Sequence, residues 1–343
     1  MKKSIFITFC GIVLTNISAL AQQPLHYWQN PEAMLQAQAT LLFTQAHTVL
    51  DSNPPSYPAN NERKLALFSI DALLHDTRLD NSDAFLAYIQ SRYRHVSTML
   101  KKERPTGKEI RIYKLYNHGF VIQSPSVTIG IDIIRGGPAQ KPFVGDSVIE
   151  AVVSQCDILF VSHLHGDHAD KSVAQIFCNQ NKSVVAPPGL WEELSPKLNY
   201  LREEHIATKK IPIQGKNVVL TVKVFPGHQD AVPNNLYAVT TPEGITVMHT
   251  GDQYNKEDMA WITQVGNNTK VDVLIIHSWI PELEKTVESI KPQLMVVGHE
   301  NEMEHSIDHR ESYWLSFRRF NQVITPYMVM AWGESCTYRL EAI

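Results

Sequence analysis

The sequence predicts an α/β domain preceded by a small helical N-terminal region. Three observations lead to this fold class. Apolar residues at helical spacing run through residues 24–105, short apolar runs typical of strands begin near residue 110, and helical stretches alternate with those runs further along the chain. The chain has 343 residues, 43% hydrophobic and 19% charged, so it can bury a large core and is unlike a disordered protein or a coiled coil.

The first residues are typical of a secretory signal peptide. Two lysines precede an apolar run from Ile5 to Leu14, and Ala19-Leu20-Ala21 is a small-residue cleavage site. A membrane anchor needs about 20 apolar residues, whereas this run is interrupted at Thr15. We therefore expect a signal peptide over residues 1–21 and a periplasmic or secreted protein with no membrane segment after cleavage.

The charge balance excludes some partners. The chain has 31 Lys and Arg against 35 Asp and Glu, and loss of the two signal lysines takes the formal charge from −4 to −6. This balance gives no basic surface for nucleic acid, so we expect a small-molecule substrate. Three cysteines remain after cleavage, Cys156, Cys178 and Cys336, which allow one disulfide at most, and the apolar surroundings of Cys156 and Cys178 favour buried thiols at these two positions. The sequence does not determine the oligomeric state.

Residues 24–105 predict three helices. The first begins with Asn30 as its cap and Pro31 at its first position, and it ends at Asn53-Pro54-Pro55. The second covers residues 65–74, and the third follows Ser82-Asp83. Helices of this size form a small bundle, and the charged stretch 101–108 suits a linker. We expect the histidines of these helices to lie on helix surfaces; they are His47, His75 and His95.

Residues 108–343 predict one α/β domain. Two helical stretches stand out, Asp170–Cys178 and Trp191–Glu204. The predicted strands are Ile110–Leu115, Phe120–Ile122, Val127–Ile134, Ile158–Val161, Ser183–Ala186, Val218–Phe225, Leu236–Thr240, Ile245–His249, Val271–Ile276 and Leu294–Val297. No internal repeat is visible, although two weakly similar β-rich halves would be easy to miss.

One predicted strand, Ile158–Val161, runs directly into a polar cluster of residues 162–168. Residues two apart in an extended chain point to the same side, so His163 and His165 can bind one metal ion together. Gly166 allows a sharp turn, and we expect Asp167 and His168 to begin the next helix, facing a second ion. The alternative, an exposed polar loop, requires three histidines within six positions by chance.

The segment His163-Leu164-His165-Gly166-Asp167-His168 resembles the HxHxDH signature of the metallo-β-lactamase fold superfamily. The family pattern continues with a His, an Asp and a last His at strand ends, and this sequence has His228, Asp252 and His299 after apolar runs in that order. Upstream, Asp132 resembles the structural Asp that ends the family's first such strand. The resemblance covers about residues 108–343 and leaves out the helical N-terminus.

This resemblance implies a four-layer αββα sandwich with a dinuclear metal centre. It implies that one ion is bound by His163, His165 and His228. It implies that the other is bound by Asp167, His168 and His299, with Asp252 bridging the two. Imidazoles and carboxylates suit Zn²⁺, and they also accept Mn²⁺ or Fe²⁺. Two such ions polarise a substrate oxygen and lower the pKa of bound water to about 7, so we expect hydrolysis.

The ligand pattern also narrows the branch of the superfamily. Asp252 stands where a Cys or Ser would indicate lactam-cleaving members, and His165 stands where a Glu would indicate the di-iron electron-transfer branch. The arrangement is similar to lactonase and phosphodiesterase members, including ascorbate-6-phosphate lactonase-like proteins. Those often have Thr after the Asp, whereas this chain has Gln253-Tyr254.

Three further residues are expected beside the metals. Asp132 is expected to orient a ligating loop. His249 and His277 end apolar strands, and each either orients ligands or contacts substrate, or is a packed, hydrogen-bonded histidine at the sheet edge.

Other polar residues near these strands have less specific signals. His118 lies either at the pocket rim or in a structural turn. For His305 and His309, a solvated loop is the favoured position, and for Arg135 a solvated surface.

The leading functional hypothesis is an exported dinuclear hydrolase that attacks a small ester, lactone or phosphodiester with a metal-bridging hydroxide. Asp167 would position the hydroxide and take its proton. One alternative is a partner-binding or assembly protein that uses its helical N-terminus and has a secondary metal site. Another is a β-lactam hydrolase.

Overall fold

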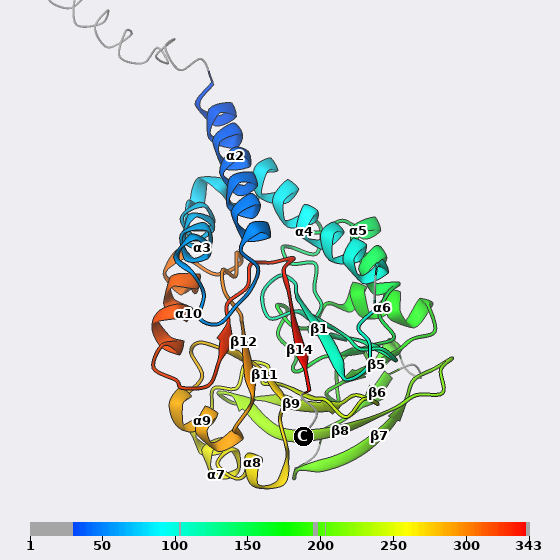
Figure 1. Cartoon of the computed structure of the whole chain (residues 1–343). Coiled ribbons are helices and arrows are strands. Elements are labelled where there is room, and N and C mark those ends of the chain that lie inside the picture. The colour runs from blue at the N-terminus through cyan, green and yellow to red at the C-terminus, as the bar shows by residue number, and fades with distance from the viewer. Residues whose placement is uncertain (1–29, 103, 195–197, 203, 341–343) are drawn as a thin grey trace, which may run out of the picture.

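The computed structural model describes residues 30–102, 104–194, 198–202 and 204–340. Figure 1 shows their arrangement, with helices above and beside a pair of sheets. The predicted signal peptide, residues 1–21, lies outside the described residues. Within the described ranges, every helix is too short or too polar to cross a bilayer.

Two seven-stranded sheets form the centre of the molecule. The first has the order β14-β1-β2-β3-β4-β5-β6, with the bounds β1 Glu109–Lys114, β2 Phe120–Gln123, β3 Thr128–Ile131, β4 Ile158–Phe160, β5 Ser183–Ala186, β6 Leu198–Tyr200 and β14 Ser335–Arg339. The second has the order β13-β12-β11-β10-β9-β8-β7, with the bounds β7 Ala207–Pro212, β8 Val219–Gln229, β9 Val232–Thr240, β10 Thr246–His249, β11 Val273–His277, β12 Leu294–Gly298 and β13 Tyr327–Met328. Every predicted strand is present, and β6, β7, β13 and β14 are additional.

The two sheets repeat one topology. Strands β1 to β3 pair antiparallel and β3 to β6 pair parallel, while β8 to β10 pair antiparallel and β10 to β13 pair parallel. An equivalent hydrogen bond ties each half together, because Thr128 N donates to Asp157 Oδ2 and Thr246 N donates to Asp272 Oδ2, both at 2.8 Å. The chain therefore contains two β-rich halves of the same topology, whose similarity is not visible in the sequence.

Helices cover the outer faces of both sheets, so the layers are αββα, as predicted. Figure 1 shows α4 to α6 beside the first sheet and α7 to α10 beside the second. A hydrophobic layer between the sheets packs Ile129 and Phe160 of the first sheet with Val239 and Val247 of the second. The helix bounds are α2 Pro31–Ser52, α3 Asn61–Leu74, α4 Asp83–Lys101, α5 Asp146–Val153, α6 Lys171–Asn179, α7 Met259–Ile262, α8 Val265–Asn268, α9 Leu283–Ile290 and α10 Tyr313–Phe320, with 3₁₀ turns η2 Thr77–Leu79, η3 Glu192–Leu194, η4 Lys256–Asp258 and η5 Ile307–His309.

The helix predicted over Trp191–Glu204 is wrong. The described part of this stretch forms the single turn η3 and then strand β6. Pro196 explains the failure of the pattern, because a proline inside a helix lacks the amide proton for the i→i−4 hydrogen bond and clashes with the preceding turn.

Helices α2 and α4 begin where the sequence predicts, whereas α3 begins at Asn61, before the predicted start at Leu65. The side chain of Asn30 accepts a hydrogen bond from Ala33 N at 3.0 Å, and Ser82 Oγ accepts one from Phe85 N at 3.2 Å. These side chains satisfy amides that have no partner inside the helix, which is why α2 and α4 start at the residues that follow them.

The histidines of these helices differ in burial. His95 is exposed as expected, and His75 is half-buried. His47 is buried, with Nε2 3.2 Å from Tyr88 Oη, and the surface prediction for it is wrong. Helix α2 turns this side toward α4, so a residue on a largely exposed helix is covered.

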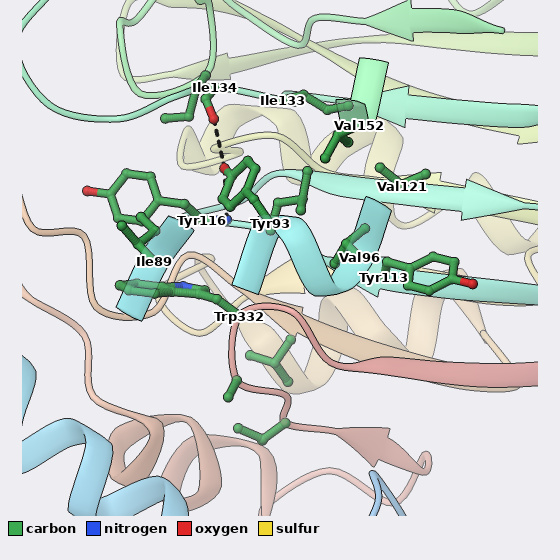
Figure 2. Close-up of a cluster of buried hydrophobic side chains, with 14 of the residues drawn as sticks. Ile89, Tyr93, Val96, Tyr113, Tyr116, Val121, Ile133, Ile134, Val152 and Trp332 are labelled. Carbon is green, nitrogen blue, oxygen red and sulfur yellow. Dashed lines mark hydrogen bonds between the residues drawn. The ribbon is translucent and has the colours of Figure 1, made fainter. Parts of the chain in front are cut away.

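Helix α4 belongs to the main core. Figure 2 shows Tyr93 and Val96 of this helix among side chains of the first sheet and Trp332. Tyr93 Oη donates to Ile134 O at 2.7 Å and accepts from Tyr116 N at 3.3 Å. The helical region and the α/β region therefore share one continuous hydrophobic cluster.

The cysteine prediction agrees with the structure. Cys156, Cys178 and Cys336 are all buried, and none is in a disulfide within the described ranges.

Candidate metal centre

The polar motif follows strand β4, and a compact turn shapes it. His168 N and Ala169 N both donate to His165 O, at 3.0 and 2.8 Å. Helix α6 begins only at Lys171, so Asp167 and His168 lie in the turn before the helix, and the prediction that they begin it is wrong. Asp170 is the cap instead, because its side chain accepts hydrogen bonds from the first amides of α6.

Six of the seven predicted ligands converge at one end of the sheets. One group consists of Asp167, His168, Asp252 and His299, and a second consists of His163, His165 and Asp167; within each group the ligand atoms lie within 4.8 Å of one another. Asp167 belongs to both groups. These residues come from the ends of β4, β10 and β12, so the sheet edges assemble a site whose parts are far apart in the sequence.

Asp252 lies between the two groups. Its Oδ1 is 3.0 Å from His168 Nε2, and its Oδ2 is 3.3 Å from His299 Nε2 and 3.9 Å from His163 Nε2. A carboxylate with histidines of both groups on its two oxygens has the position that a bridging ligand requires.

His228 lies apart from both groups. Its Nδ1 is 3.1 Å from Asp258 Oδ2, and its Nε2 accepts a hydrogen bond from Arg202 Nη2 at 3.1 Å. The side chain is 31% exposed, whereas His163 and His168 are fully buried. The structure does not bring His228 to the other ligands, and its role at a metal stays a prediction.

The buried polar atoms of the site fit divalent metal ions. The Nε2 atoms of His163, His168 and His299 and the Oδ1 atom of Asp252 are buried, and although the imidazoles approach the Asp252 carboxylate to 3.0–3.9 Å, these four atoms lack a hydrogen-bond partner of suitable geometry among the described residues. Leaving such atoms unpaired in the interior costs on the order of 1–3 kcal/mol each. Coordination would satisfy all four, and a set of imidazole nitrogens and carboxylate oxygens suits Zn²⁺, Mn²⁺ or Fe²⁺.

Electrostatics within the cluster are strong. Burial alone would lower the pKa of His168, but the carboxylates of Asp252 and Asp167 outweigh it and raise this pKa well above its usual value. Burial, together with His168, lowers the pKa of His163 to about 4, so this imidazole is neutral and its nitrogen can serve as a ligand. Metal binding must displace protons from the charged histidines, which makes affinity dependent on pH.

Asp132 contacts the loop that carries His168, as an orienting residue would. It follows β3 in a left-handed conformation with φ of 46°, and its Oδ2 accepts a hydrogen bond from His168 Nδ1 at 2.8 Å. Its Oδ1 accepts from Ser162 N at 2.7 Å, and Oδ2 also accepts from Ser162 Oγ at 2.6 Å. A proton held at Nδ1 leaves Nε2 of His168 as the ligand atom.

His249 supports the strand that carries Asp252. Its Nδ1 accepts from Gly251 N at 3.0 Å, and its Nε2 donates to His118 O at 3.0 Å, so His249 is a packed, hydrogen-bonded residue behind the site. Gly251 has φ of 50°, and a Cβ there would lie 2.1 Å from Asn234 Oδ1. Glycine is therefore required directly before Asp252.

His277 and His118 are fully buried beside the ligands. The His277 ring lies 3.8 Å from the Trp279 ring and 6.3 Å from the His299 ring, between centroids. His118 lies beside His249, with ring centroids 4.2 Å apart, and belongs to the turn between β1 and β2, not to a pocket rim. Burial lowers the pKa of both imidazoles, which are therefore neutral.

Two residues of the site have no clear signal in the sequence. Asn117 Nδ2 donates to Asp167 Oδ2 at 3.1 Å, and Asn117 O accepts from His299 N at 3.1 Å, so one residue ties two ligands together. Glu302 is buried with Oε2 3.8 Å from His299 Nε2 and 3.1 Å from His305 Nδ1, and burial raises its pKa to about 8. Its position three residues after His299 is the only sequence signal for it.

Two cavities meet at Asp167. One of about 490 Å³ contains His165, Asp252 and His299 in its wall, together with Trp279, Leu315 and the histidines His305 and His309. The other, of about 680 Å³, runs past Gly136, Gly137 and Pro138 to Arg135, Glu302 and Glu304. The loop histidines therefore face a cavity while remaining exposed, and Arg135 is mostly buried and paired with Asp170 and Asp146, so the prediction that it is solvated is wrong.

Comparison with known proteins agrees with this geometry. No family model matches the chain. It is similar to a UPF0173 metal-dependent hydrolase of Thermococcus kodakarensis, with 24% identity over 201 residues, which cover 56% of this chain and 85% of that protein. Its structure is similar to that of Igni18, described as a novel metallo hydrolase from the hyperthermophilic archaeon Ignicoccus hospitalis, with a TM-score of 0.52, 15% identity and coverage of 68% of this chain and 100% of that one.

A weaker structural likeness, with a TM-score of 0.49 and 14% identity, relates it to CmlA, a diiron β-hydroxylase of Streptomyces venezuelae, over 69% of this chain and 55% of that one. None of these names bears on the ascorbate-6-phosphate lactonase-like branch, which stays a prediction. The sequence relative and the Igni18 structure are named as metal-dependent or metallo hydrolases, in agreement with the enzyme class that the motif predicts. This chain has an αββα fold similar to that of the Igni18 metallo hydrolase, and its sequence is similar to that of a metal-dependent hydrolase.

Proposed function

We propose that this chain is an exported, dinuclear metal-dependent hydrolase of small esters or lactones. The observation that carries the proposal is the set of buried histidine and aspartate atoms that converge without partners at the meeting point of two cavities. Two divalent ions, Zn²⁺ by preference and otherwise Mn²⁺ or Fe²⁺, would supply Lewis acidity and an activated water there. Export rests on the predicted signal peptide.

Asp167 is proposed as the catalytic residue. Its side chain is 17% exposed and lines both cavities, whereas His168 and Asp252 are almost completely buried. Burial alone would raise the pKa of this carboxyl, but His168 holds it well below the usual value, so Asp167 is ionised and can position an attacking water by accepting a hydrogen bond from it. The hydrogen bond from Asn117 Nδ2 fixes the orientation of the carboxylate.

The cavity walls favour an uncharged substrate over a phosphodiester. Three Lys and Arg side chains line the two cavities, and each is already in an ion pair: Arg135 with Asp170, Lys171 with Glu193, and Arg310 with Asp80. The acidic residues of the walls, beyond the predicted metal ligands, are Asp170, Glu302, Glu304, Asp308 and Glu311. Among these described wall residues, every Lys and Arg is already in an ion pair and none is left to bind a phosphate group, so we infer an ester or a lactone.

The indole ring of Trp279 defines one wall of the smaller cavity. It lies 5.3 Å from the His299 ring in an edge-on arrangement, and Leu315 lines the same cavity. These side chains offer an apolar surface close to the ligands. We infer that the substrate has an apolar or aromatic group beside the scissile bond.

A variant series with a substrate panel tests the proposal. His165→Ala and Asp252→Ala should each lower kcat/KM at least about a hundredfold, because each removes a ligand. His95→Ala, an exposed histidine far from the site, is the matched control and should retain wild-type turnover. Turnover should be highest on uncharged esters or lactones; a panel in which phosphodiesters or a chromogenic cephalosporin are preferred would refute the substrate class.

A further inference from the structure

The loop of residues 299–312 joins strand β12 to helix α10 and supplies much of the site. It begins with the predicted ligand His299, and Glu302, His305 and His309 line the cavities. Both His299 and Asn301 have left-handed backbones, with φ of 70° and 59°. Such conformations are strained in residues other than glycine and persist only where surrounding contacts hold them. The contacts that hold this loop should therefore control the position of His299.

One carboxylate of helix α3 holds both ends of the loop. Asp71 Oδ1 accepts hydrogen bonds from Asn301 Nδ2 at 3.0 Å and from Tyr313 N at 2.8 Å, while Oδ2 accepts one from Trp314 N at 3.0 Å. Asp71 is 7% exposed, and its burial raises its pKa to about 6. A buried carboxylate has a high desolvation cost unless donors surround it, and all three of these donors belong to the loop or to the start of α10.

A second tie reaches the middle of the loop. Arg310 is buried, forms a two-point ion pair with Asp80 at 2.8 Å on both oxygens, and donates to Leu74 O at 2.9 Å. The same guanidinium donates to His305 O at 3.0 Å and Met303 O at 3.1 Å within the loop. Arg310 thus connects residues 74–80 directly to the part of the loop that faces the cavity.

The N-terminal helices do not form the walls of the site. The residues that line the two cavities beside Asp167 all lie after residue 134, so within the described ranges α2, α3 and α4 contribute none of them. Helix α3 instead lies beside α10, the helix that follows the loop (Figure 1). The N-terminal helices therefore do not form a lid over the cavities. Helix α3 lies behind the loop, where it can support it.

We propose that helix α3 and the turn after it are a built-in support of the metal centre, with Asp71 and Asp80 as positioning residues that hold the loop bearing His299 in its metal-binding arrangement. This proposal rests on the proposed function in two respects, the assignment of His299 as a metal ligand and the binding of two ions per chain. It assigns the helical region of the chain to the catalytic site, in place of partner binding or assembly.

The test compares two variants of the full-length chain with the same change in charge. Asp80→Asn weakens the tie to the buried Arg310. Asp76→Asn weakens a two-point ion pair between Asp76 and the exposed Arg78, which stays within the same turn and does not reach the loop. Zn²⁺ titration by calorimetry measures the affinity of each ion, and hydrogen exchange measures the opening of peptides 299–312 and 160–170. Thermal unfolding of both variants controls for global stability.

Asp80→Asn should weaken one of the two Zn²⁺ equivalents about tenfold and speed exchange in peptide 299–312, while the other equivalent and peptide 160–170 stay as in the wild type. Asp76→Asn should leave both Zn²⁺ affinities and the exchange rates of both peptides unchanged. Asp71→Asn should have a larger effect in the same direction on the same ion and the same peptide. The proposal is overturned if Asp80→Asn behaves as Asp76→Asn, or if both ions and both peptides change together, as a merely structural role would produce.

These readouts separate this proposal from the proposed function. Neither the titration nor the exchange measurement requires a substrate. A wild-type protein that binds Zn²⁺ but hydrolyses nothing would remove the proposed function, and the selective response of the loop to Asp80→Asn would still decide the role of the helices.

Discussion

Asp132→Asn should remove one metal ion without unfolding the protein. In the wild type the carboxylate accepts from Ser162 N at 2.7 Å and from His168 Nδ1 at 2.8 Å, on different oxygens. An asparagine has one oxygen and one amide nitrogen in these two positions. If the oxygen keeps the Ser162 amide, the nitrogen faces His168 and donates to Nδ1, which moves the imidazole proton to Nε2.

A proton on Nε2 blocks the atom that should bind the metal. Loss of such an orienting partner typically weakens metal affinity 10- to 100-fold, or about 1.4–2.7 kcal/mol. We expect a loss at the upper end, since the asparagine actively stabilises the wrong tautomer and also removes a buried negative charge beside His168. The ion bound by His168 should be affected most, because Asp132 accepts a hydrogen bond from His168 directly, whereas it reaches His163 only through the Ser162 hydroxyl.

Zn²⁺ titration by calorimetry and metal analysis after dialysis measure this effect. Asp157→Asn is the matched control, because Asp157 accepts from Thr128 N at 2.8 Å in the first sheet but lies away from the ligands. The control should retain wild-type metal content. Equal affinities for Asp132→Asn and the wild type would refute the orienting role of Asp132, and so would an equal loss in the control.

Three further outcomes follow from the structure. Burial, with Arg92 nearby, lowers the pKa of His47 from 6.5 to about 3, so neutral His47 contributes fully to stability above pH 6.5, and this contribution is lost as the pH falls toward 3. Between pH 7.5 and pH 5, the free energy of unfolding should therefore fall by about 2 kcal/mol more in the wild type than in His47→Gln, as measured by denaturant unfolding. An equal fall in both proteins would contradict this. Gly251→Ala should cost about 2–4 kcal/mol in the same assay and lower Zn²⁺ content, because its Cβ would collide with Asn234; wild-type stability would show that the turn does not need glycine. Burial raises the pKa of Cys156 and Cys336 to about 12, so a thiol reagent should reach these two residues only after denaturation, and rapid labelling of the native protein would contradict their burial.

The central part of the fold could be predicted from the sequence because its strands are buried on both faces. Strands β4, β10 and β12 are almost unbroken apolar runs, and each is followed within a few residues by a polar side chain that reaches the site. The edge strands carry no such signal. Strand β7 buries only Ile211, β13 has two residues, and β14 buries only Cys336 among polar neighbours.

The cluster of histidines and aspartates could be predicted because the motif fixes residue types at short spacing, but the residues that support the cluster could not. Asn117 reaches Asp167 across 50 residues, and Asp71 reaches Asn301 across 230 residues. No local pattern encodes contacts of this range, since they exist only once the sheets and helices pack. For His228 the motif gives a position in the sequence but not the direction of the side chain, which depends on contacts with Asp258 and Arg202.

Metal content and turnover, measured together on the purified protein, test the central claim most directly. Chelation followed by dialysis should give a metal-free chain with no hydrolytic activity, and stepwise addition of Zn²⁺ should restore turnover of an uncharged ester or lactone until two ions are bound per chain. Full turnover by the metal-free protein, or saturation of activity with no bound metal, would contradict the claim that these histidines and aspartates form a dinuclear hydrolytic centre.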